Sequence, residues 1–210
     1  VTEQVTGLDL VSLQLQVARG AKLSELGVDD VRQSGIALQV RVNAERQQAD
    51  GSVLPSGGTL AVFDPPAGPG LRVDTLGYTG YEVAGAYDSL LAKLVVTRPS
   101  GDLGELLASA YRALCEFRVE GVATNIGFLQ NLLQHAEVEA GNWYTGLLGD
   151  HGSELSANGE GRHRRLFFED DAAPAVAAEG GIVADAGERV LCSAMPGTVV
   201  SLAVEVGQLL

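Results

Sequence analysis

Arg72 is the residue of this 210-residue chain whose type and setting most suggest chemistry. It follows a turn rich in proline and glycine at 64–70 (DPPAGPG) and lies in the alternating run 71–74 (LRVD). Side chains alternate between the two faces of a strand, so Arg72 and Asp74 are expected to share a face. A rigid turn before the strand would hold the guanidinium in one direction, where it could stabilise negative charge on a bound molecule. Spacing alone also fits a plainer alternative, an Arg72–Asp74 ion pair on a solvated sheet face.

Metal chemistry is not predicted. His135 lies in the last turn of an expected helix, where a positive charge would favour the helix dipole, and no second ligand is spaced along the sequence to join it. Cys115 and Cys192 lie far apart and form no CxxC motif. That pattern is typical of buried or idle thiols in a reducing compartment rather than of a zinc site or a disulfide.

The composition narrows the possible partners. The net charge of −13 argues against nucleic acid or an anionic membrane surface as a partner. The hydrophobic content of 46% and charged content of 20% are ordinary for a globular protein. No apolar run approaches the roughly 20 residues that a bilayer-spanning helix needs, so the predicted location is cytoplasmic.

A mainly antiparallel sheet is predicted to hold Arg72 in place. Strand-forming runs occur at 59–63, 70–76 and 87–96, separated by turns that contain glycine or proline. The almost wholly apolar run 87–96 is expected to be a central strand covered on both faces. Residues 35–45 also alternate, and a hairpin through 47–58 should join them to the next strand. In this strand the apolar residues Ile36, Leu38, Val40 and Val42 should face inward and the polar residues Gln39, Arg41 and Asn43 outward.

Three helices complete a predicted α+β fold. The first should begin with Thr6 as its N-cap and end near Gly20. The second should begin at Asp102 in a capping box, present an apolar stripe through Phe117 and end at Gly121. The third should run from Thr124 or Asn125 to about His135. The resulting architecture is a mainly antiparallel sheet with packed helices.

Six short motifs occur in an order that resembles one known family. They are VTEQVTGLDLVSLQLQVARG at 1–20, QVRVNAE at 39–45, LPSGGTLAVFDPPAGPGLRVD from 54, GYTGYEV from 77, YDSLLAKLVV from 87 and ALCEFRVEGVATNIGFLQNLL from 113. Together they resemble the C-terminal domain of biotin carboxylase, the ATP-dependent part of biotin-dependent carboxylases. The resemblance covers residues 1–148, which we predict to form this domain.

The remainder of the chain differs in character. Residues 149–181 are polar, acidic and rich in alanine, as expected of a linker. Residues 182–210 resemble the opening strands of a biotinyl carrier domain (a β-rich barrel-sandwich). The carrier's biotin-bearing lysine stands between two methionines, whereas this chain has one methionine, Met195, and neither Lys22 nor Lys93 is flanked by methionine. We therefore interpret the segment as the first half of a carrier, and the chain as a piece of a longer polypeptide.

The resemblance implies a function. Biotin carboxylase carboxylates biotin with ATP and bicarbonate, for later transfer to an acceptor such as an acyl-CoA of fatty acid metabolism. ATP and Mg²⁺ would be held mainly by an upstream ATP-grasp domain. Arg72 would correspond to the arginine that contacts the ureido oxygen of biotin, and would be both catalytic and cofactor-binding. The expected partners are that ATP-grasp domain, a biotinyl carrier, a carboxyltransferase and a second copy of the chain.

Two alternatives are left open by the sequence. The chain could be a non-catalytic dimerisation or interaction module that retains this fold. It could also be the same piece of a pyruvate or urea carboxylase, because the acceptor-specific transferase is not within these residues. In either catalytic case the chain is expected to be an inactive part of an ATP-dependent ligase when it is alone.

Overall fold

The computed structural model describes residues 1–48, 50–84, 88–157 and 163–167. The predicted biotinyl segment, 182–210, and most of the predicted linker lie outside the described residues. The division of the chain into 1–148, 149–181 and 182–210 therefore stays a prediction.

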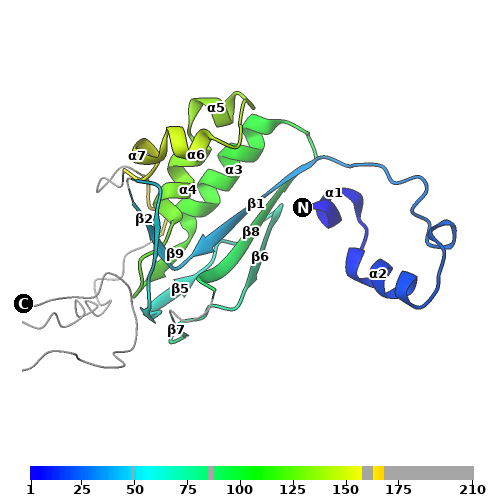
Figure 1. Cartoon of the computed structure of the whole chain (residues 1–210), viewed down its shortest axis with the longest axis horizontal. Coiled ribbons are helices and arrows are strands. Elements are labelled where there is room, and N and C mark those ends of the chain that lie inside the picture. The colour runs from blue at the N-terminus through cyan, green and yellow to red at the C-terminus, as the bar shows by residue number, and fades with distance from the viewer. Residues whose placement is uncertain (49, 85–87, 158–162, 168–210) are drawn as a thin grey trace, which may run out of the picture.

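A three-stranded antiparallel sheet forms the centre of the domain (Figure 1). Its strand order is β1 (Ile36–Asn43), β8 (Leu90–Arg98) and β6 (Leu71–Thr75). The prediction that the apolar strand is central is confirmed, because β8 pairs with β1 on one edge and β6 on the other. Leu94 and Val96 of β8 are fully buried, as a strand covered by other elements requires.

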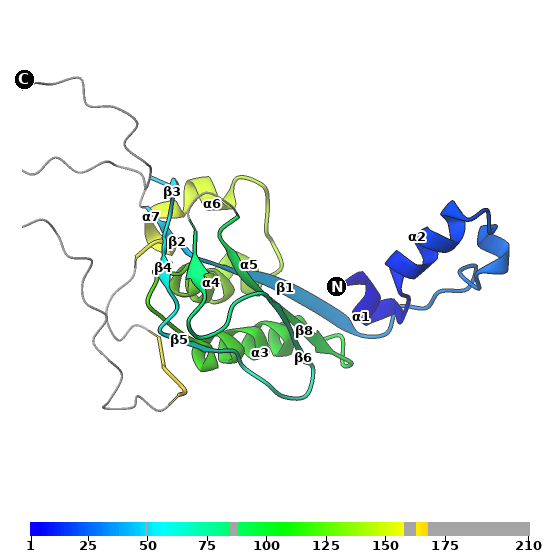
Figure 2. The ribbon, with the colours of Figure 1, turned by 90° about the horizontal axis from the view of Figure 1, so that it is seen from below.

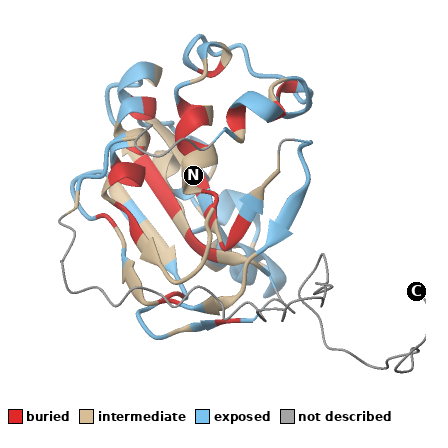
Figure 3. Cartoon of the chain, turned by 90° about the vertical axis from the view of Figure 1, so that its left-hand side faces the viewer, coloured by how far each residue is buried: buried red, intermediate tan, exposed pale blue. Residues whose placement is uncertain are grey.

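The main core lies between one face of this sheet and helix α3 (Leu103–Glu116). Val42 of β1 and Leu94 of β8 meet the apolar stripe of α3, in which Leu114 is 1% exposed. Asp102 is the N-cap of α3 and accepts a hydrogen bond from the backbone N–H of Glu105 at 2.8 Å. Figure 3 shows that the buried positions concentrate on the strands and on the helix faces turned toward them.

Three small two-stranded sheets adjoin the central sheet, and two of their strands correct the prediction. The helix ends at Glu116 rather than at Gly121, because residues 118–120 pair with another strand. The hairpin after β1 returns through residues 53–55 instead of 59–63. The pairs are β2 (Glu45–Gln47) with β3 (Val53–Pro55), β4 (Gly58–Thr59) with β7 (Glu82–Val83), and β5 (Val62–Asp64) with β9 (Arg118–Glu120).

Four helices after β9 cover the same side of the sheet as α3 (Figures 1 and 2). They are α4 (Ile126–Leu133), α5 (Ala136–Glu139), α6 (Leu147–Asp150) and α7 (Gly152–Leu155). Leu147 and Leu155 are buried in the main core, which holds α6 and α7 against the domain. His135 does not lie in the last turn of a helix as predicted, because α4 ends at Leu133 and His135 is the N-cap of α5.

The first two helices stand beside the sheet (Figure 2). They are α1 (Thr2–Thr6) and α2 (Leu10–Ala18), followed by a 3₁₀ turn at Leu23–Glu25. The predicted single helix with Thr6 as N-cap was wrong: Gly7 ends α1 in a left-handed conformation, and Asp9 caps α2. No residue of α2 is buried, and Val11 and Leu15 are 68% and 56% exposed.

No helix within the described ranges has both the length and the apolar character that crossing a bilayer requires.

The Cys115 thiol should resist alkylation in the folded protein. Cys115 is 2% exposed in α3, and burial raises the pKa of its thiol, which lowers the fraction of reactive thiolate. In a Cys192→Ser background, we expect iodoacetamide at neutral pH to label Cys115 only when denaturant is added. Mass spectrometry of the native and denatured samples measures this, and rapid labelling of the native sample would contradict the buried position.

Candidate functional site

Arg72 lies on the face of the central sheet opposite to the main core, in an ion pair with Asp74. Its Nε donates to Asp74 Oδ1 at 2.8 Å and its Nη2 to Asp74 Oδ2 at 3.2 Å. A second carboxylate comes from α1, because Arg72 Nη1 lies 3.3 Å from Glu3 Oε1. The ion pair that the spacing suggested is therefore present, and the Arg72 side chain is 45% exposed.

These contacts shift the pKa values of Arg72 and Asp74 so that both side chains stay charged. The hydrogen bond to Asp74 raises the pKa of the Arg72 guanidinium. The hydrogen bond from Arg72 lowers the pKa of the Asp74 carboxyl. Since both groups are near the surface, the pair adds little to stability, and its main effect is to fix the direction of the guanidinium.

A second arginine stands on the same face. Arg41 of β1 is directly opposite Lys93 of β8, and Lys93 is directly opposite Asp74 of β6. Residues that are directly opposite in an antiparallel sheet point to the same side. Arg41, Lys93, Asp74 and Arg72 therefore form a polar patch on the outer face, with β1 and β6 about 10 Å apart across β8. We call these four residues the outer-face patch.

The two arginines of the outer-face patch differ in their partners. Arg72 is matched by two carboxylates, Asp74 and Glu3, so its charge is already compensated. Arg41 is exposed, and among the described residues its guanidinium has no ion pair or hydrogen bond. Lys93 lies between them, with its Nζ 3.9 Å from Asp74 Oδ2. Arg41 is thus the guanidinium of this patch that is free to bind an incoming anion or carbonyl oxygen.

A buried polar network holds the strand that carries Arg41. Asn125, 6% exposed, donates to the backbone carbonyl of Arg41 at 3.1 Å and accepts from the backbone N–H of Asn43 at 2.9 Å. It also lies 3.4 Å from the carboxylate of Glu45, which is 9% exposed. Glu45 accepts further hydrogen bonds from the side chains of Asn43, Gln47 and Ser89.

This network was not predicted from the sequence. The available signal was the placement of polar residues in QVRVNAE and GVATN at the ends of apolar runs, where the alternation would leave them exposed. Such residues are buried only when their partners arrive from elsewhere in the chain, as Asn125 does across 82 positions to Asn43.

Replacing Asn125 with Ala should destabilise the domain by about 2–3 kcal/mol, because it leaves the Arg41 carbonyl, the Asn43 N–H and the Glu45 carboxylate short of partners. Urea unfolding of the two proteins measures the difference. Asn142→Ala, at an exposed position, is the control and should change the free energy of unfolding by less than about 0.5 kcal/mol. Equal effects of the two substitutions would show that the network is not stabilising.

The sequence spacing gave no second ligand for His135, but the fold places two further candidate ligands beside it. The fold brings His151 and Glu154 beside it, so that one ligand atom of each residue lies within 4.8 Å of the others. His151 and Glu154 come from the turn before α7 and from α7 itself, which the sequence could not place relative to His135.

Comparison with known proteins identifies the class to which this fold belongs. The family described as Biotin carboxylase C-terminal domain matches residues 39–150, which is more than half of the chain. The chain therefore belongs to this family, whose members are parts of biotin-dependent carboxylases. The match contains β1 from Gln39 onward, all four residues of the outer-face patch and the Asn125 network, whereas Glu3 lies outside it.

Individual proteins give the same result. The chain is 40% identical over 148 residues to Biotin carboxylase 1 of Bacillus subtilis (strain 168), covering 70% of this chain and 32% of that protein. It is similar to the structure of a single-chain, multi-domain long-chain acyl-CoA carboxylase, with a TM-score of 0.70, 47% identity, and coverage of 76% of this chain and 18% of that one. For the biotin carboxylase domain dimer of Hydrogenobacter thermophilus 2-oxoglutarate carboxylase, solved with MgADP and bicarbonate, the TM-score is 0.67, the identity 32%, and the coverage 76% and 34%. The chain spans about a third or less of the length of these relatives.

Proposed function

We propose that this chain closes the biotin side of the active site of an ATP-dependent biotin carboxylase. The observation that carries the proposal is the outer-face patch, within the region that matches the family: its Arg41 guanidinium stands on a rigid strand and has no ion pair or hydrogen bond among the described residues. When bound, biotin supplies a ureido nitrogen that takes up the carboxyl group, and negative charge develops on the neighbouring ureido oxygen. A fixed guanidinium stabilises that charge as it forms.

Arg41 is the residue that we propose for this contact. Its guanidinium donors have no partner in the part of the chain that the structure describes, and Asn125 fixes the backbone on which Arg41 stands. Arg72, the residue indicated by the sequence resemblance, remains a second candidate for catalysis and biotin binding. For Arg72 to take the role, it would have to turn from Glu3 while it keeps Asp74, because a guanidinium matched by two carboxylates offers little net charge to an oxyanion.

The remaining parts of the enzyme are proposed from the relatives. An ATP-grasp part would supply the sites for ATP and Mg²⁺, and a biotinyl carrier and a carboxyltransferase would deliver and use the biotin. The exposed apolar side chains of α2, including Val11 and Leu15, support a partner surface on this side, because large apolar groups at these exposures are more usual where another domain packs. We propose that α2 packs against the ATP-grasp part.

We further propose an acyl-CoA as the final carboxyl acceptor. The long-chain acyl-CoA carboxylase is 47% identical to this chain, whereas the 2-oxoglutarate carboxylase is 32% identical. An acceptor assay with the complete enzyme tests this directly: carboxylation of acyl-CoA but not of pyruvate, 2-oxoglutarate or urea is the expected result. Homo-oligomerisation and a cytoplasmic location are part of the same proposal.

The 210-residue chain alone should show no bicarbonate-dependent ATP cleavage, with or without free biotin, because the proposal places the ATP site elsewhere. A phosphate-release assay measures this. Addition of the ATP-grasp part, on the same or on a separate chain, should give biotin-dependent ATP cleavage. ATP cleavage by the chain alone would contradict the proposal that the ATP site lies on the ATP-grasp part. Failure of the combined parts to cleave ATP would favour the alternative that the chain is a non-catalytic interaction module.

A further inference from the structure

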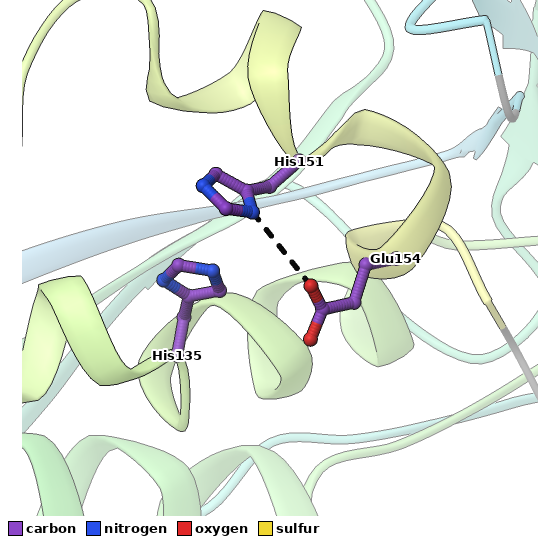
Figure 4. A group of neighbouring side chains, drawn as sticks. All are labelled: His135, His151 and Glu154. Atoms are coloured by element: carbon purple, nitrogen blue, oxygen red, sulfur yellow. Dashed lines mark ion pairs between the residues drawn. The ribbon is translucent and has the colours of Figure 1, made fainter.

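We propose that His135, His151 and Glu154 form a binding site for a divalent transition-metal ion, with Zn²⁺ the best match. Two imidazoles and one carboxylate are ligands that suit zinc, and three protein ligands leave a position for water. Figure 4 shows the three side chains pointing toward one another: His135 is the N-cap of α5, His151 is the N-cap of α7, and Glu154 lies in the first turn of α7.

The geometry leaves one nitrogen of each histidine for the metal. His151 Nδ1 lies 3.7 Å from Glu154 Oε2, and the rings of His135 and His151 are 4.5 Å apart between centroids. His135 Nδ1 accepts the backbone N–H of Glu137 at 3.3 Å, which leaves Nε2 as its open nitrogen. One ring nitrogen of His135 faces the space between His151 and Glu154 in Figure 4.

Small side-chain movements would complete the site. The three ligand atoms lie within 4.8 Å of one another, whereas two ligands of a tetrahedral zinc are separated by about 3.3 Å. The Glu154 side chain is 63% exposed and His151 34%, so both can move inward. Binding at Nε2 leaves the ring proton of His135 on Nδ1, so the long hydrogen bond from Glu137 is exchanged for one to water.

The surroundings favour a cation. The segment 135–157 contains four carboxylates, Glu137, Glu139, Asp150 and Glu154, and no lysine or arginine. A pocket of about 170 Å³ adjoins the cluster and is lined by Asn131, Gln134, His135, Glu154 and Leu155. Negative charge around a small polar pocket lowers the energy of a bound divalent ion.

The ion would connect two parts of the helical layer. His135 joins α4 to α5, whereas His151 and Glu154 belong to the α6–α7 segment. That segment is also held by buried Leu147 and Leu155, by the hydrogen bond from Asn131 Nδ2 to the Leu155 carbonyl at 2.7 Å, and just after α7 by the hydrogen bond from Ser156 Oγ to the Gln48 carbonyl at 3.0 Å. A bound zinc would therefore stabilise α6 and α7 against the domain, at a site separate from the outer-face patch on the other side of the sheet.

Zinc binding to the untagged 210-residue chain tests the proposal, in a Cys192→Ser background so that this thiol does not compete. After chelator treatment and dialysis against zinc, elemental analysis should find one zinc per chain. Free zinc at about 100 times the dissociation constant should raise Tm by roughly 5–10 °C. Cobalt(II) should give visible d–d bands without a thiolate charge-transfer band.

Single substitutions identify the ligands. His135→Gln, His151→Gln and Glu154→Gln should each weaken zinc binding at least tenfold and reduce the rise in Tm. His163→Gln is the matched control, because both ring nitrogens of His163 are engaged elsewhere, with Tyr111 and Asn131, and its zinc affinity should be unchanged. Glu154 is exposed, so Glu154→Gln decides the test if a histidine variant fails to fold. Absence of zinc binding in the parent chain, or equal binding by the parent and Glu154→Gln chains, would overturn the proposal.

Discussion

Replacing Arg41 with Ala should lower kcat for carboxylation of biotin by about 10²–10³-fold in the complete enzyme, which is the loss typical of removing one oxyanion donor. The loss should fall on kcat more than on KM, because the charge on the ureido oxygen develops only as the reaction proceeds. Arg41→Lys should recover little, since an ammonium cannot reproduce the planar guanidinium fork. Steady-state carboxylation of free biotin measures kcat and KM of the parent, Arg41→Ala and Arg41→Lys enzymes.

Comparison with the Arg72→Ala variant shows which of the two arginines contacts the ureido oxygen of biotin. We expect its kcat to fall much less, because Glu3 and Asp74 already compensate the charge of Arg72. Asp74→Ala should likewise change kcat little, and neither substitution should lower Tm appreciably, because both residues lie at the surface of the sheet. A large loss in Arg72→Ala and Asp74→Ala, with near-normal activity in Arg41→Ala, would transfer the biotin contact to Arg72.

Replacing Gly121 with Ala should destabilise the domain by about 3 kcal/mol or more. Gly121 has φ +103°, a conformation that costs a residue with a Cβ roughly 1–2 kcal/mol. An added Cβ would also collide with the backbone carbonyl of Thr59 and lie 2.7 Å from the backbone nitrogen of Ala61. Neither contact can be relieved by a side-chain rotation, so the β5–β9 junction would have to move. Urea unfolding monitored by circular dichroism measures the change.

A substitution at Gly80 separates the cost of the positive φ from the cost of the backbone collision. Gly80 has φ +91°, but an added Cβ would meet no atom within 4 Å. Gly80→Ala should therefore cost only the conformational part, about 1–2 kcal/mol. If both substitutions cost the same, the close approach of Gly121 to Thr59 would not be contributing, and the packing at this junction would be looser than described.

The sequence correctly predicted those features that depend on a residue pattern within a single strand or helix. The apolar run that became β8 predicted a central strand, and the stripe from Leu106 to Leu114 predicted the buried face of α3. The Arg72–Asp74 pair followed from alternation along a single strand. These features depend on neighbours within a few positions, so local periodicity was sufficient.

The features that were missed depend on distant parts of the chain. Strand β9 forms by pairing with β5, in which Val119 is opposite Phe63, and a local pattern cannot indicate a partner so distant in the sequence. That the Arg41 guanidinium has no partner among residues with a described position can be recognised only from the fold, in which Glu3 and Asp74 reach Arg72 instead. His135 and His151 meet because two short helices turn back on α4.

Transfer of labelled bicarbonate to free biotin tests the central claim most directly. The enzyme formed by this chain and the ATP-grasp part should produce labelled carboxybiotin only when ATP, Mg²⁺ and biotin are all present, and Arg41→Ala should remove nearly all of the label. Formation of carboxybiotin at the same rate after Arg41→Ala and Arg72→Ala, singly and together, would contradict the claim that the outer-face patch is the biotin side of the active site.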